Sequence, residues 1–343
     1  MKKGFSIIVC CYNSADVIED TLRSLSHIKT DNRFDIELII VDNCSTDDTS
    51  QLSQKFLTLN KVSFNYKIVT EKRSGLSFAR RRGIDESGFE YLIFCDDDNR
   101  LSPDYALRSF ELMESNNSIG AAGGFGNAVS VMKFPEWFEE FKKSYSAGAQ
   151  AEMAGDITSR EGYVWGAGMV MRKYAIERLY ENGFHSLLSD RKKEILSSGG
   201  DVEICYALRL SGYNIFYESA LKFDHYIRPE RLKWKHLRRL YRGFGMQKPL
   251  LEPYLEIYKS GSEYKRKSWK KESAILIKRL RGYGFRKLSD FGKNSEGDRE
   301  VLRIEKTIGR LKQLVKMKET YENNFETVRG AGWNNFTNTK PKA

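Results

Sequence analysis

The chain has 343 residues, of which 40% are hydrophobic, and a formal net charge of +11 at pH 7. This length allows a sizeable core and excludes a small domain held together by disulfides. No apolar run reaches the roughly 18 residues of a membrane-spanning helix, and the N-terminus lacks a secretory cleavage site, which predicts a cytoplasmic protein. The five cysteines form no CxxC pair and are odd in number, so we expect reduced thiols rather than disulfides or a zinc site.

The positive charge is concentrated in the last third of the chain. From Arg228 to the end there are 30 Lys and Arg against 13 Asp and Glu, whereas residues 1–227 carry 27 against 33. Two interpretations of this basic region remain open: a solvated helical surface, or a surface that binds anionic lipid headgroups or a phosphorylated acceptor, peripherally at the inner face of the cell membrane. No helix-turn-helix, zinc-finger or RNP pattern accompanies the charge, so we expect no nucleic acid partner.

Short β-rich runs alternate with helical patterns through the first part of the chain. The first run, FSIIVCCY, ends in polar residues, and residues 14–26 then place apolar side chains on one helical face. The alternation recurs, with strands expected at 36–42, 64–70 and 91–96 and helices beginning near residues 45, 76 and 103. Such repeats predict an α/β fold with a doubly wound, mainly parallel sheet flanked by helices.

Polar side chains gather where the expected strands end, which is where such sheets bind ligands. These residues are Cys10, Tyr12 and Asn13 after the first strand, Asp42 and Asn43 after the second, and Asp96, Asp97 and Asp98 after the fourth. The set suits a nucleotide, because Tyr12 can stack on a base while Asp42 and Asn43 can bond to its edge or to the ribose. For Asp42, a turn or helix cap before residues 45–49 remains an alternative.

The three consecutive aspartates are expected to face a cation. Neighbouring carboxylates repel one another and lose hydration in a cleft, so the triplet costs stability unless positive charge lies among them. A helix cap explains only one of the three. A divalent cation that bridges two phosphates is therefore the expected ligand.

Six stretches occur in an order and spacing typical of one family: SIIVCCYNSADVIEDTLRSL, IELIIVDNCSTD, SGLSFARRRGI, FCDDDNRLSPDY, GYVWGAGMVMRK and GGDVEICYALRLSGYNIFY. Together they resemble a family 2 inverting glycosyltransferase of the GT-A fold, over roughly residues 5–227. Asn43 and Gly200 depart from the family pattern, in which acidic residues are common at both positions. The chain lacks the QxxRW signature of processive synthases, so we expect one sugar per encounter.

The resemblance implies a hexosyltransferase that uses Mn²⁺ or Mg²⁺ and a nucleoside diphosphate sugar, with UDP as the expected carrier. The implied acceptor is a glycan or lipid-linked molecule of the bacterial surface-polysaccharide type. The implied metal ligands are Asp98, Asp96 and His225. The implied nucleotide-sugar contacts are Cys10, Tyr12, Asn13, Asp42, Asn43, Gly75, Arg80, Asp96 and Asp97. The implied acceptor floor is Trp165, Gly166 and Gly168. For His225 and Trp165, a packed histidine and a tryptophan buried in a core strand are the alternatives.

Asp201 is the catalytic base that the resemblance implies. It stands at the head of an expected helix after the flexible pair Gly199-Gly200, so its carboxylate can project into a cleft and take the proton of an acceptor hydroxyl. The alternative is a helix N-cap, because aspartate is among the best capping residues.

We expect three parts in the chain. Residues 1–227 form a catalytic domain, with a nucleotide-binding half (1–100) and an acceptor-binding half (101–227) that includes an amphipathic helix over residues 134–145. Residues 228–328 form a basic helical extension, either interfacial or packed, and residues 329–343 are expected to be disordered.

Two other classes of protein are alternatives to the glycosyltransferase. A non-catalytic receiver-like module also places acids at strand ends, but the chain is too long and lacks the expected lysine late in the sheet. A nucleotidyltransferase should carry a glycine-rich phosphate loop after the first strand, and CCYNSADVIED contains no glycine.

Overall fold

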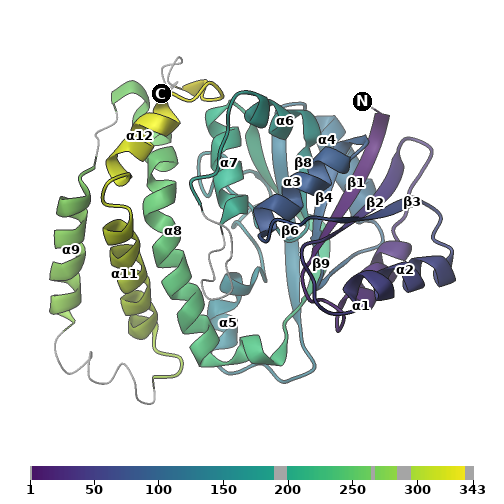
Figure 1. Cartoon of the computed structure of the whole chain (residues 1–343), viewed down its shortest axis with the longest axis horizontal. Helices are drawn as coiled ribbons and strands as arrows, with labels where there is room; N and C mark the ends of the chain where they lie inside the picture. The colour runs from purple at the N-terminus through teal and green to yellow at the C-terminus, as the bar shows by residue number, and fades with distance from the viewer. Residues whose placement is uncertain (1, 189–198, 264–266, 284–294, 337–343) are drawn as a thin grey trace. The chain divides into compact units, whose positions relative to one another are not determined.

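The computed structural model describes residues 2–188, 199–263, 267–283 and 295–336 (Figure 1). The chain divides into two compact units. Unit 1 comprises Met1–Ser130, Tyr145–Arg178 and Tyr213–Ile227, and unit 2 comprises Val131–Ser144, Leu179–Gly212 and Arg228–Ala343. The division differs from the expected boundary at residue 227, because two segments of the expected acceptor half group with the C-terminal helices.

Unit 1 is built on one sheet, which has nine strands within the described residues, in the order β3-β2-β1-β4-β8-β6-β9-β5, with β7 paired to β9. The strands are β1 (Lys2–Cys11), β2 (Asp35–Asp42), β3 (Asn65–Thr70), β4 (Phe89–Asp96), β5 (Asn99–Leu101), β6 (Ile119–Val129), β7 (Gly155–Asp156), β8 (Met169–Arg172) and β9 (Asn214–Tyr226). β1 pairs in parallel with both β2 and β4, and β2 pairs in parallel with β3. The pairs of β8 with β4 and β6, and of β9 with β5 and β7, are antiparallel, so the sheet is mixed. The expected α/β class is confirmed.

Helices follow the strands of unit 1 in the expected alternation. They are α1 (Ile18–Ser26), α2 (Thr49–Asn60), α3 (Leu76–Glu86), α4 (Tyr105–Ser115) and α6 (Lys173–Glu181), the last of which crosses into unit 2. α1 begins four residues later than the pattern predicts, because Ser14 instead accepts backbone bonds from Val17 and Ile18 in a turn. The chain therefore turns once between β1 and its helix.

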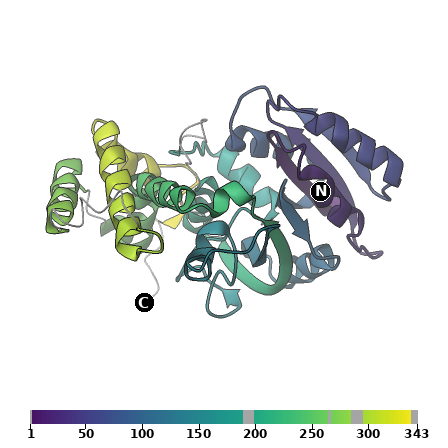
Figure 2. The same ribbon diagram turned by 90° about the horizontal axis from the view of Figure 1, so that it is seen from below.

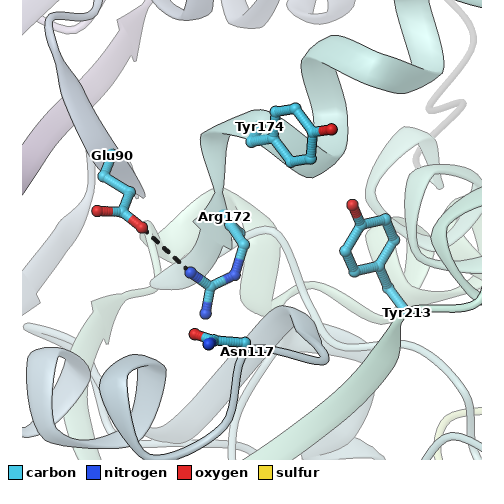
Figure 3. Close-up of a pocket in the computed structure, with 5 residues that line it drawn as sticks. All are labelled: Glu90, Asn117, Arg172, Tyr174 and Tyr213. Carbon is cyan, nitrogen blue, oxygen red and sulfur yellow. Dashed lines mark hydrogen bonds and ion pairs between the residues drawn. The ribbon is translucent and has the colours of Figure 1, made fainter. Parts of the chain in front are cut away.

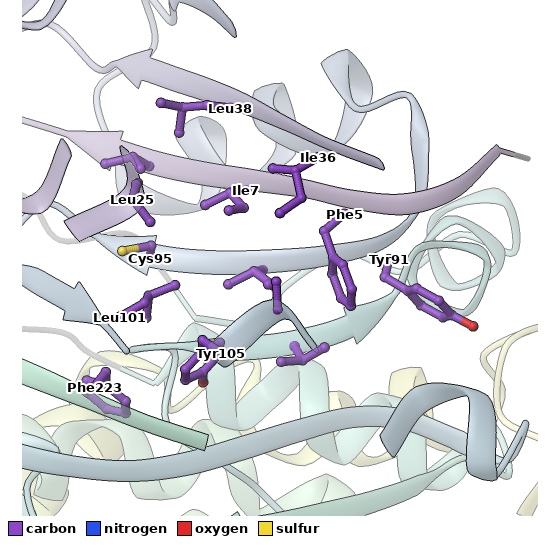
Figure 4. Close-up of a cluster of buried hydrophobic side chains, with 14 of the residues drawn as sticks. Phe5, Ile7, Leu25, Ile36, Leu38, Tyr91, Cys95, Leu101, Tyr105 and Phe223 are labelled. Carbon is purple, nitrogen blue, oxygen red and sulfur yellow. The ribbon is translucent and has the colours of Figure 1, made fainter. Parts of the chain in front are cut away.

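Alternate residues of β1 pack on opposite faces of the sheet, as strand geometry requires. Phe5 contacts Tyr91 and Phe34 in the core cluster that also takes in Leu25 of α1 and Tyr105 of α4 (Figure 4). On the other face, a Cβ placed at Gly83 of α3 would lie 2.4 Å from Cγ2 of Ile8. Helices thus cover both faces of the central strand, which is the doubly wound arrangement.

Unit 2 is helical in its described part. Its helices are α5 (Phe138–Phe141), α7 (Gly200–Leu210), α8 (Trp234–Ser260), α9 (Trp269–Gly282), α11 (Arg299–Lys316) and α12 (Tyr321–Arg329). α5 is shorter than the helix expected over 134–145, and a 3₁₀ turn, Lys142–Tyr145, completes that segment. No helix within the described ranges is long and apolar enough to span a bilayer.

α11 lies between α8 and α9 (Figures 1 and 2). α8 and α11 meet at two glycines: a Cβ at Gly245 would lie 2.0 Å from the carbonyl oxygen of Lys306, and one at Gly309 would lie 2.0 Å from that of Arg242. Glu305, 2% exposed, accepts from the Nε atoms of Arg238 at 2.9 Å and Arg242 at 2.6 Å. Arg238 and Arg242 of the basic extension therefore pack inside the helical layer, as one of the two interpretations of that region predicts.

The expected disorder of residues 329–343 is wrong for the described part of that segment. Trp333 is buried and stacks on Tyr254, with ring centroids 5.9 Å apart, and Phe336 stacks on Tyr258 at 4.8 Å. Ser211 donates a hydrogen bond to the carbonyl oxygen of Trp333 at 2.8 Å. Two aromatic anchors therefore outweigh the Gly/Asn-rich composition, and residues 337–343 lie outside the described residues.

Candidate functional site

The carboxyl ends of β1, β2 and β4 meet at one edge of the sheet. Cys10 lies opposite Asp96 in the register of β1 and β4, and Cys11 lies opposite Asp42 in that of β1 and β2. The polar residues that follow these strands are therefore neighbours in space, as the sequence predicts. Tyr12 is 48% exposed at this edge, so its ring is accessible to a planar ligand.

Asn13 ties the loop after β1 to the loop after β2. Its φ of 52° is left-handed, a conformation that asparagine tolerates. Its side-chain oxygen accepts from the backbone N–H of Thr46 at 2.8 Å, and its own N–H donates to Oγ of Ser45 at 3.1 Å. These bonds hold the backbone beside Tyr12 in place.

Asp42 stabilises the turn before α2, which was the alternative to a nucleotide-binding role. Its carboxylate accepts from the backbone N–H of Ser45 at 2.9 Å and from Oγ of Ser50 at 2.5 Å. Asp48, not Asp42, is the N-cap of α2. Since each carboxylate oxygen has two lone pairs, these bonds leave Asp42 able to accept from a base, and that contact stays a prediction.

Asn43 is 5% exposed and its amide bonds to the backbone of the following loop. Its Nδ2 donates to the carbonyl oxygens of Glu71 at 3.1 Å and Arg73 at 2.8 Å, and its Oδ1 accepts from Gly75 N–H at 2.8 Å. Gly75, at φ 145° and ψ 142°, is the N-cap of α3. Asn43 therefore positions Gly75 and the start of α3, and its direct contact with a nucleotide remains untested.

The three arginines of α3 point in different directions, as helical geometry predicts. Arg80 is 7% exposed, with its guanidinium 5.8 Å from the ring centroid of Phe94 in β4. Arg81 and Arg82 pair instead with acids one turn along the helix, Asp85 and Glu86, each at 2.8 Å. Arg80 therefore lies against a strand of the sheet.

Cys10 is a protonated thiol. Burial raises its pKa to about 12, although the nearby positive charge of Arg80 acts in the opposite direction. Because the thiolate is the reactive form, Cys10 is no nucleophile at neutral pH. Its place at the strand end allows contact with a ligand through its side chain or backbone.

Asp97 is held by Ser14, which precedes α1, and by Thr21 in the first turn of α1. The sequence patterns did not single out either residue. The hydroxyl of the fully buried Ser14 donates to its carboxylate, and the hydroxyl of Thr21 donates to its carbonyl oxygen at 2.7 Å. In the sequence Ser14 is one of several polar residues that follow the first strand, and its complete burial is seen only in the folded chain. These bonds connect the aspartate triplet to the loop that carries Tyr12.

His225 of β9 faces Asp98, with 3.5 Å between Nε2 and Oδ1. The ring is 4% exposed, and its Nδ1 lies 2.7 Å from the carbonyl oxygen of Tyr145. A carbonyl can only accept, so Nδ1 carries a proton, and Nε2 is the ring atom that faces the carboxylate. The packed-histidine alternative describes its burial but not this orientation.

A carboxylate and an imidazole with a fixed tautomer are a suitable beginning of a site for Mn²⁺. Among the described residues, no group of three or more His, Cys, Asp and Glu side chains is close enough to hold a metal ion. The expected trio of Asp96, Asp98 and His225 is thus not assembled, because β4 ends at Asp96 and the chain turns before Asp98. Asp98 and His225 are the pair that the structure brings together.

The segment around Trp165 is held rigidly. Gln150, 8% exposed, accepts from the backbone N–H of Trp165 at 2.7 Å and donates to the carbonyl oxygen of Gly124 at 2.7 Å. Trp165 is partly exposed and lies outside any strand, so the core-strand alternative is wrong.

Gly166 and Gly168 shape the turn that leads into β8. Gly166 accepts a backbone bond from Met169 at 3.2 Å. Gly168 has φ 68°, and a Cβ there would lie 2.7 Å from the hydroxyl oxygen of Tyr105. Only glycine fits this position, and contact of the turn with an acceptor remains a prediction.

Asp201 lies in the first turn of α7 in unit 2. Gly199, with φ 122°, occupies the N-cap, so the capping alternative for Asp201 is wrong. A Cβ at Gly199 would lie 2.7 Å from Oε1 of Gln247 in α8. Asp201 is partly exposed, whereas Glu203 of the same helix is fully buried and accepts from Tyr254 at 2.8 Å.

A pocket of about 470 Å³ opens elsewhere in unit 1, near Glu90 at the amino-terminal end of β4 (Figure 3). Arg172 within it pairs with Glu90 at 3.3 Å. Its remaining N–H groups donate to Tyr91 Oη and to the carbonyl oxygens of Met113, Asn116 and Ile119. This guanidinium holds strands and helices together, and the pocket lies at the opposite end of the parallel strands from the predicted ligand-binding edge.

Comparison with known proteins gives sequence relatives and structural neighbours. The chain is 28% identical to a poly-β-1,6-N-acetyl-D-glucosamine synthase of Staphylococcus epidermidis over 123 residues. This match covers 36% of the chain and 28% of that synthase. The corresponding synthase of Staphylococcus aureus (strain MSSA476) is 24% identical over 219 residues, 63% of this chain and 48% of the relative. The chain thus spans less than half the length of these relatives.

Solved structures share the fold over most of the chain. TarS of S. aureus has a TM-score of 0.50 and 15% identity, covering 95% of this chain and 90% of that one. A mannosyltransferase of Pyrobaculum calidifontis, solved with GDP-Man and Mn²⁺, has a TM-score of 0.56 and 14% identity, covering 93% and 87%. These likenesses establish a fold of the GT-A type.

The family assignment rests on the sequence of residues 6–180, most of which belong to unit 1. The model of the family described as "Glycosyl transferase family 2" matches residues 6–180, which is more than half of the chain. The matched range includes every strand-end residue discussed above except His225. The chain therefore belongs to glycosyl transferase family 2.

Proposed function

We propose that the protein transfers a single sugar from a nucleoside diphosphate sugar to a hydroxyl group of a glycan or lipid-linked acceptor, with inversion at the anomeric carbon. The observation that carries this proposal is the meeting of Tyr12, Asp42 and the Asp96–Asp98 triplet at one edge of the sheet in a member of this family. Family membership sets aside the receiver-like and nucleotidyltransferase alternatives.

The donor is proposed to bind at the strand ends. Tyr12 stacks on the base, Asp42 accepts from the base or ribose, and Asp97, with Asp96, binds the ribose or the donor sugar. Arg80 bonds to the diphosphate, for which a guanidinium is well suited. A uridine carrier is supported by the UDP-GlcNAc complex of a neighbour with a TM-score of 0.50, although another neighbour carries GDP-Man.

Asp98 and His225 are proposed to be the residues that would hold Mn²⁺ or Mg²⁺ beside the donor diphosphate. When bound, such an ion neutralises the charge that develops on the leaving diphosphate. The chain's own contribution is orientation: Tyr145 fixes the tautomer of His225, and the backbone bond from Tyr226 N–H to the carbonyl oxygen of Asp98, 2.9 Å, fixes the loop.

Asp201 is proposed to take the proton from the acceptor hydroxyl as that oxygen attacks the anomeric carbon and the nucleoside diphosphate leaves from the opposite face. The motif in which it stands supports this role, as does its partial exposure at the start of α7. Trp165, with Gly166 and Gly168, is proposed to form a floor on which a sugar ring stacks. The acceptor is proposed to reach the protein at an anionic membrane surface.

A donor screen tests the proposal. Purified protein is incubated with UDP-, GDP- and TDP-sugars, with and without Mn²⁺, and thermal shift and release of nucleoside diphosphate are measured. One donor should raise the melting temperature in a metal-dependent manner, because ligand binding stabilises the folded state in proportion to the logarithm of concentration over Kd. The proposal would be contradicted if every donor failed to give a metal-dependent thermal shift and to release nucleoside diphosphate.

A further inference from the structure

Helix α9 presents an outward face that combines cations with apolar side chains. Its exposed residues are Lys270, Lys271, Ala274, Ile275, Ile277, Lys278, Arg279, Arg281 and Gly282. At 100° per residue, the exposed side chains cover an arc of about 200°. Ile275 and Ile277 are 53% and 40% exposed, which is unusual for side chains of this type.

The opposite side of α9 fixes this orientation. Leu276 is 1% exposed, and Ser273 is buried beside it. Glu272, the single acid of Trp269–Gly282, pairs with Arg310 of α11 at 2.5 Å. The one negative charge of α9 is therefore directed into the helical layer, and its outward arc carries positive charge alone.

Three arginines of the neighbouring helices are paired with buried carboxylates. Arg238 and Arg242 of α8 share the buried carboxylate of Glu305, and Arg310 of α11 also pairs with Glu252 at 2.6 Å. In the part of the chain that the structure describes, no ion pair involves the five cations of the outward arc. Other exposed cations of the layer, such as Lys235 and Arg239 of α8 and Lys312 of α11, also lie outside the ion pairs of the described residues. What distinguishes α9 is therefore the pair of exposed isoleucines beside its cations.

We propose that the outward face of α9 docks on an anionic lipid bilayer. The cations bind headgroup phosphates, and Ile275 and Ile277, about 160° apart on the helix, lie near the two edges of the arc and contact the headgroup region on either side. A soluble anion would pair with the cations but leave both isoleucines in water. This inference deepens the membrane contact within the proposed function by naming the helix, the face and the lipid charge.

The test uses the full chain and vesicles of phosphatidylcholine alone or with about one-third phosphatidylglycerol, in a flotation assay over a range of salt. The variant Lys271→Gln/Lys278→Gln removes two charges from the middle of the arc, and glutamine keeps nearly the helix propensity of lysine. Each cation near an anionic surface contributes about fivefold to partitioning, so this variant should bind about 25-fold more weakly, with a shallower salt dependence.

Two further variants separate the components. Lys29→Gln/Lys55→Gln makes the same change in net charge at exposed positions of unit 1 and should bind the vesicles like the unmodified protein. Ile275→Gln should weaken binding without changing its salt dependence, because it removes only apolar contact. Nucleotide binding is measured in parallel without vesicles, so a failure of this inference is distinguished from a failure of the proposed glycosyl transfer.

Three results would overturn the inference. The first is equal binding to neutral and anionic vesicles. The second is an equal loss of binding in the α9 variant and in the unit 1 control, which would show a response to net charge alone. The third is tighter binding to duplex DNA than to anionic vesicles, with the same dependence on Lys271 and Lys278, which would identify a nucleic acid surface.

Discussion

Nε2 of His225 lies 3.5 Å from Oδ1 of Asp98, while Nδ1 of the same ring is held at 2.7 Å by the carbonyl oxygen of Tyr145. The two sides of the imidazole therefore have separate tasks. The carbonyl accepts from Nδ1 and orients the ring, and Nε2 faces a carboxylate. Nε2 of His225 and Oδ1 of Asp98 are both possible metal ligands, and a cation between them would be bound by both.

This pair gives the first prediction. His225→Asn should abolish the Mn²⁺-dependent part of nucleoside diphosphate affinity, because an asparagine amide can replace Nδ1 but provides no atom at the position of Nε2. Asp98→Ala should have the same effect. Calorimetric titration with and without Mn²⁺ measures the difference, with His27→Asn, at an exposed histidine of α1's C-cap, as a control. Unchanged metal-dependent affinity in both site variants would refute the assignment.

Asp201 is expected to act in turnover rather than in folding. Asp201→Asn should lower kcat about 10²- to 10⁴-fold with nearly unchanged nucleotide affinity, the signature of a lost general base. Because Gly199 holds the N-cap, the variant keeps the start of the helix, and the lost helix-dipole interaction costs about 0.3–1 kcal/mol. Steady-state rates and melting temperature are the measurements. A kcat within a few-fold of the unmodified protein would remove Asp201 from the mechanism.

Glu203, two residues further along α7, gives a prediction about pH. Burial raises the pKa of this carboxyl, despite hydrogen bonds from Ser186, Tyr254 and the backbone, which act in the opposite direction. The folded state therefore binds the proton more tightly than the unfolded state, so this contribution is complete below the unfolded pKa near 4.5 and is lost as pH rises through the folded value.

Urea unfolding at several pH values measures this contribution. The free energy of unfolding should decrease with rising pH above the unfolded pKa, and Glu203→Gln should flatten the decrease because it cannot ionise. Asp201→Asn, at a partly exposed position of the same helix, is the matched comparison. An unchanged pH dependence in Glu203→Gln would assign the effect to other groups.

Asn43 should act through the loop that it holds. Asn43→Asp keeps an acceptor for Gly75 N–H but cannot donate to the carbonyl oxygens of Glu71 and Arg73, and each lost partner of a buried group costs about 1–3 kcal/mol. We expect a lower melting temperature and weaker nucleotide binding together. A variant of full stability that has lost nucleotide binding would instead indicate direct contact with the ligand.

Gly168→Ala should destabilise the protein through two effects: a positive φ, and a Cβ placed 2.7 Å from the hydroxyl of Tyr105. Gly183 offers a matched control, because its φ is 81° but nothing lies within 4 Å of a Cβ built there. Gly183→Ala should therefore cost about 1 kcal/mol for the conformation, and Gly168→Ala clearly more. Equal unfolding free energies for the two variants would show that the turn adapts to the added methyl group.

The parallel half of the sheet could be predicted because its information is local. In β1, β2 and β4, an apolar run is followed directly by a polar residue, and parallel pairing then brings the strand ends together. The arrangement of Asp98 and His225 could not be predicted from spacing, because it depends on the antiparallel pairing of β5 with β9, distant in sequence. The roles of Ser14 and Gln150 were missed for the same reason, since each bonds to residues that only the folded chain brings near.

Composition misled at the C-terminus. The segment RGAGWNNF is rich in Gly and Asn, yet one tryptophan ring on Tyr254 and a backbone bond from Asn335 N–H to the carbonyl oxygen of Leu210 hold it. Disorder follows from an inability to bury enough apolar surface, and a single large aromatic side chain can supply that surface.

The reciprocal glycine contact between α8 and α11 limits how the protein can be divided for experiments. A fragment that stops before α11 would leave an open groove over Gly245 and would deprive Arg238 and Arg242 of the carboxylate of Glu305. Guanidinium groups that have lost their carboxylate partner, beside exposed apolar surface, favour aggregation and non-specific binding to polyanions. Loss of vesicle binding or of activity in such a fragment would therefore report a damaged helical layer, and point substitutions in the intact chain are the appropriate way to assign roles to its C-terminal third.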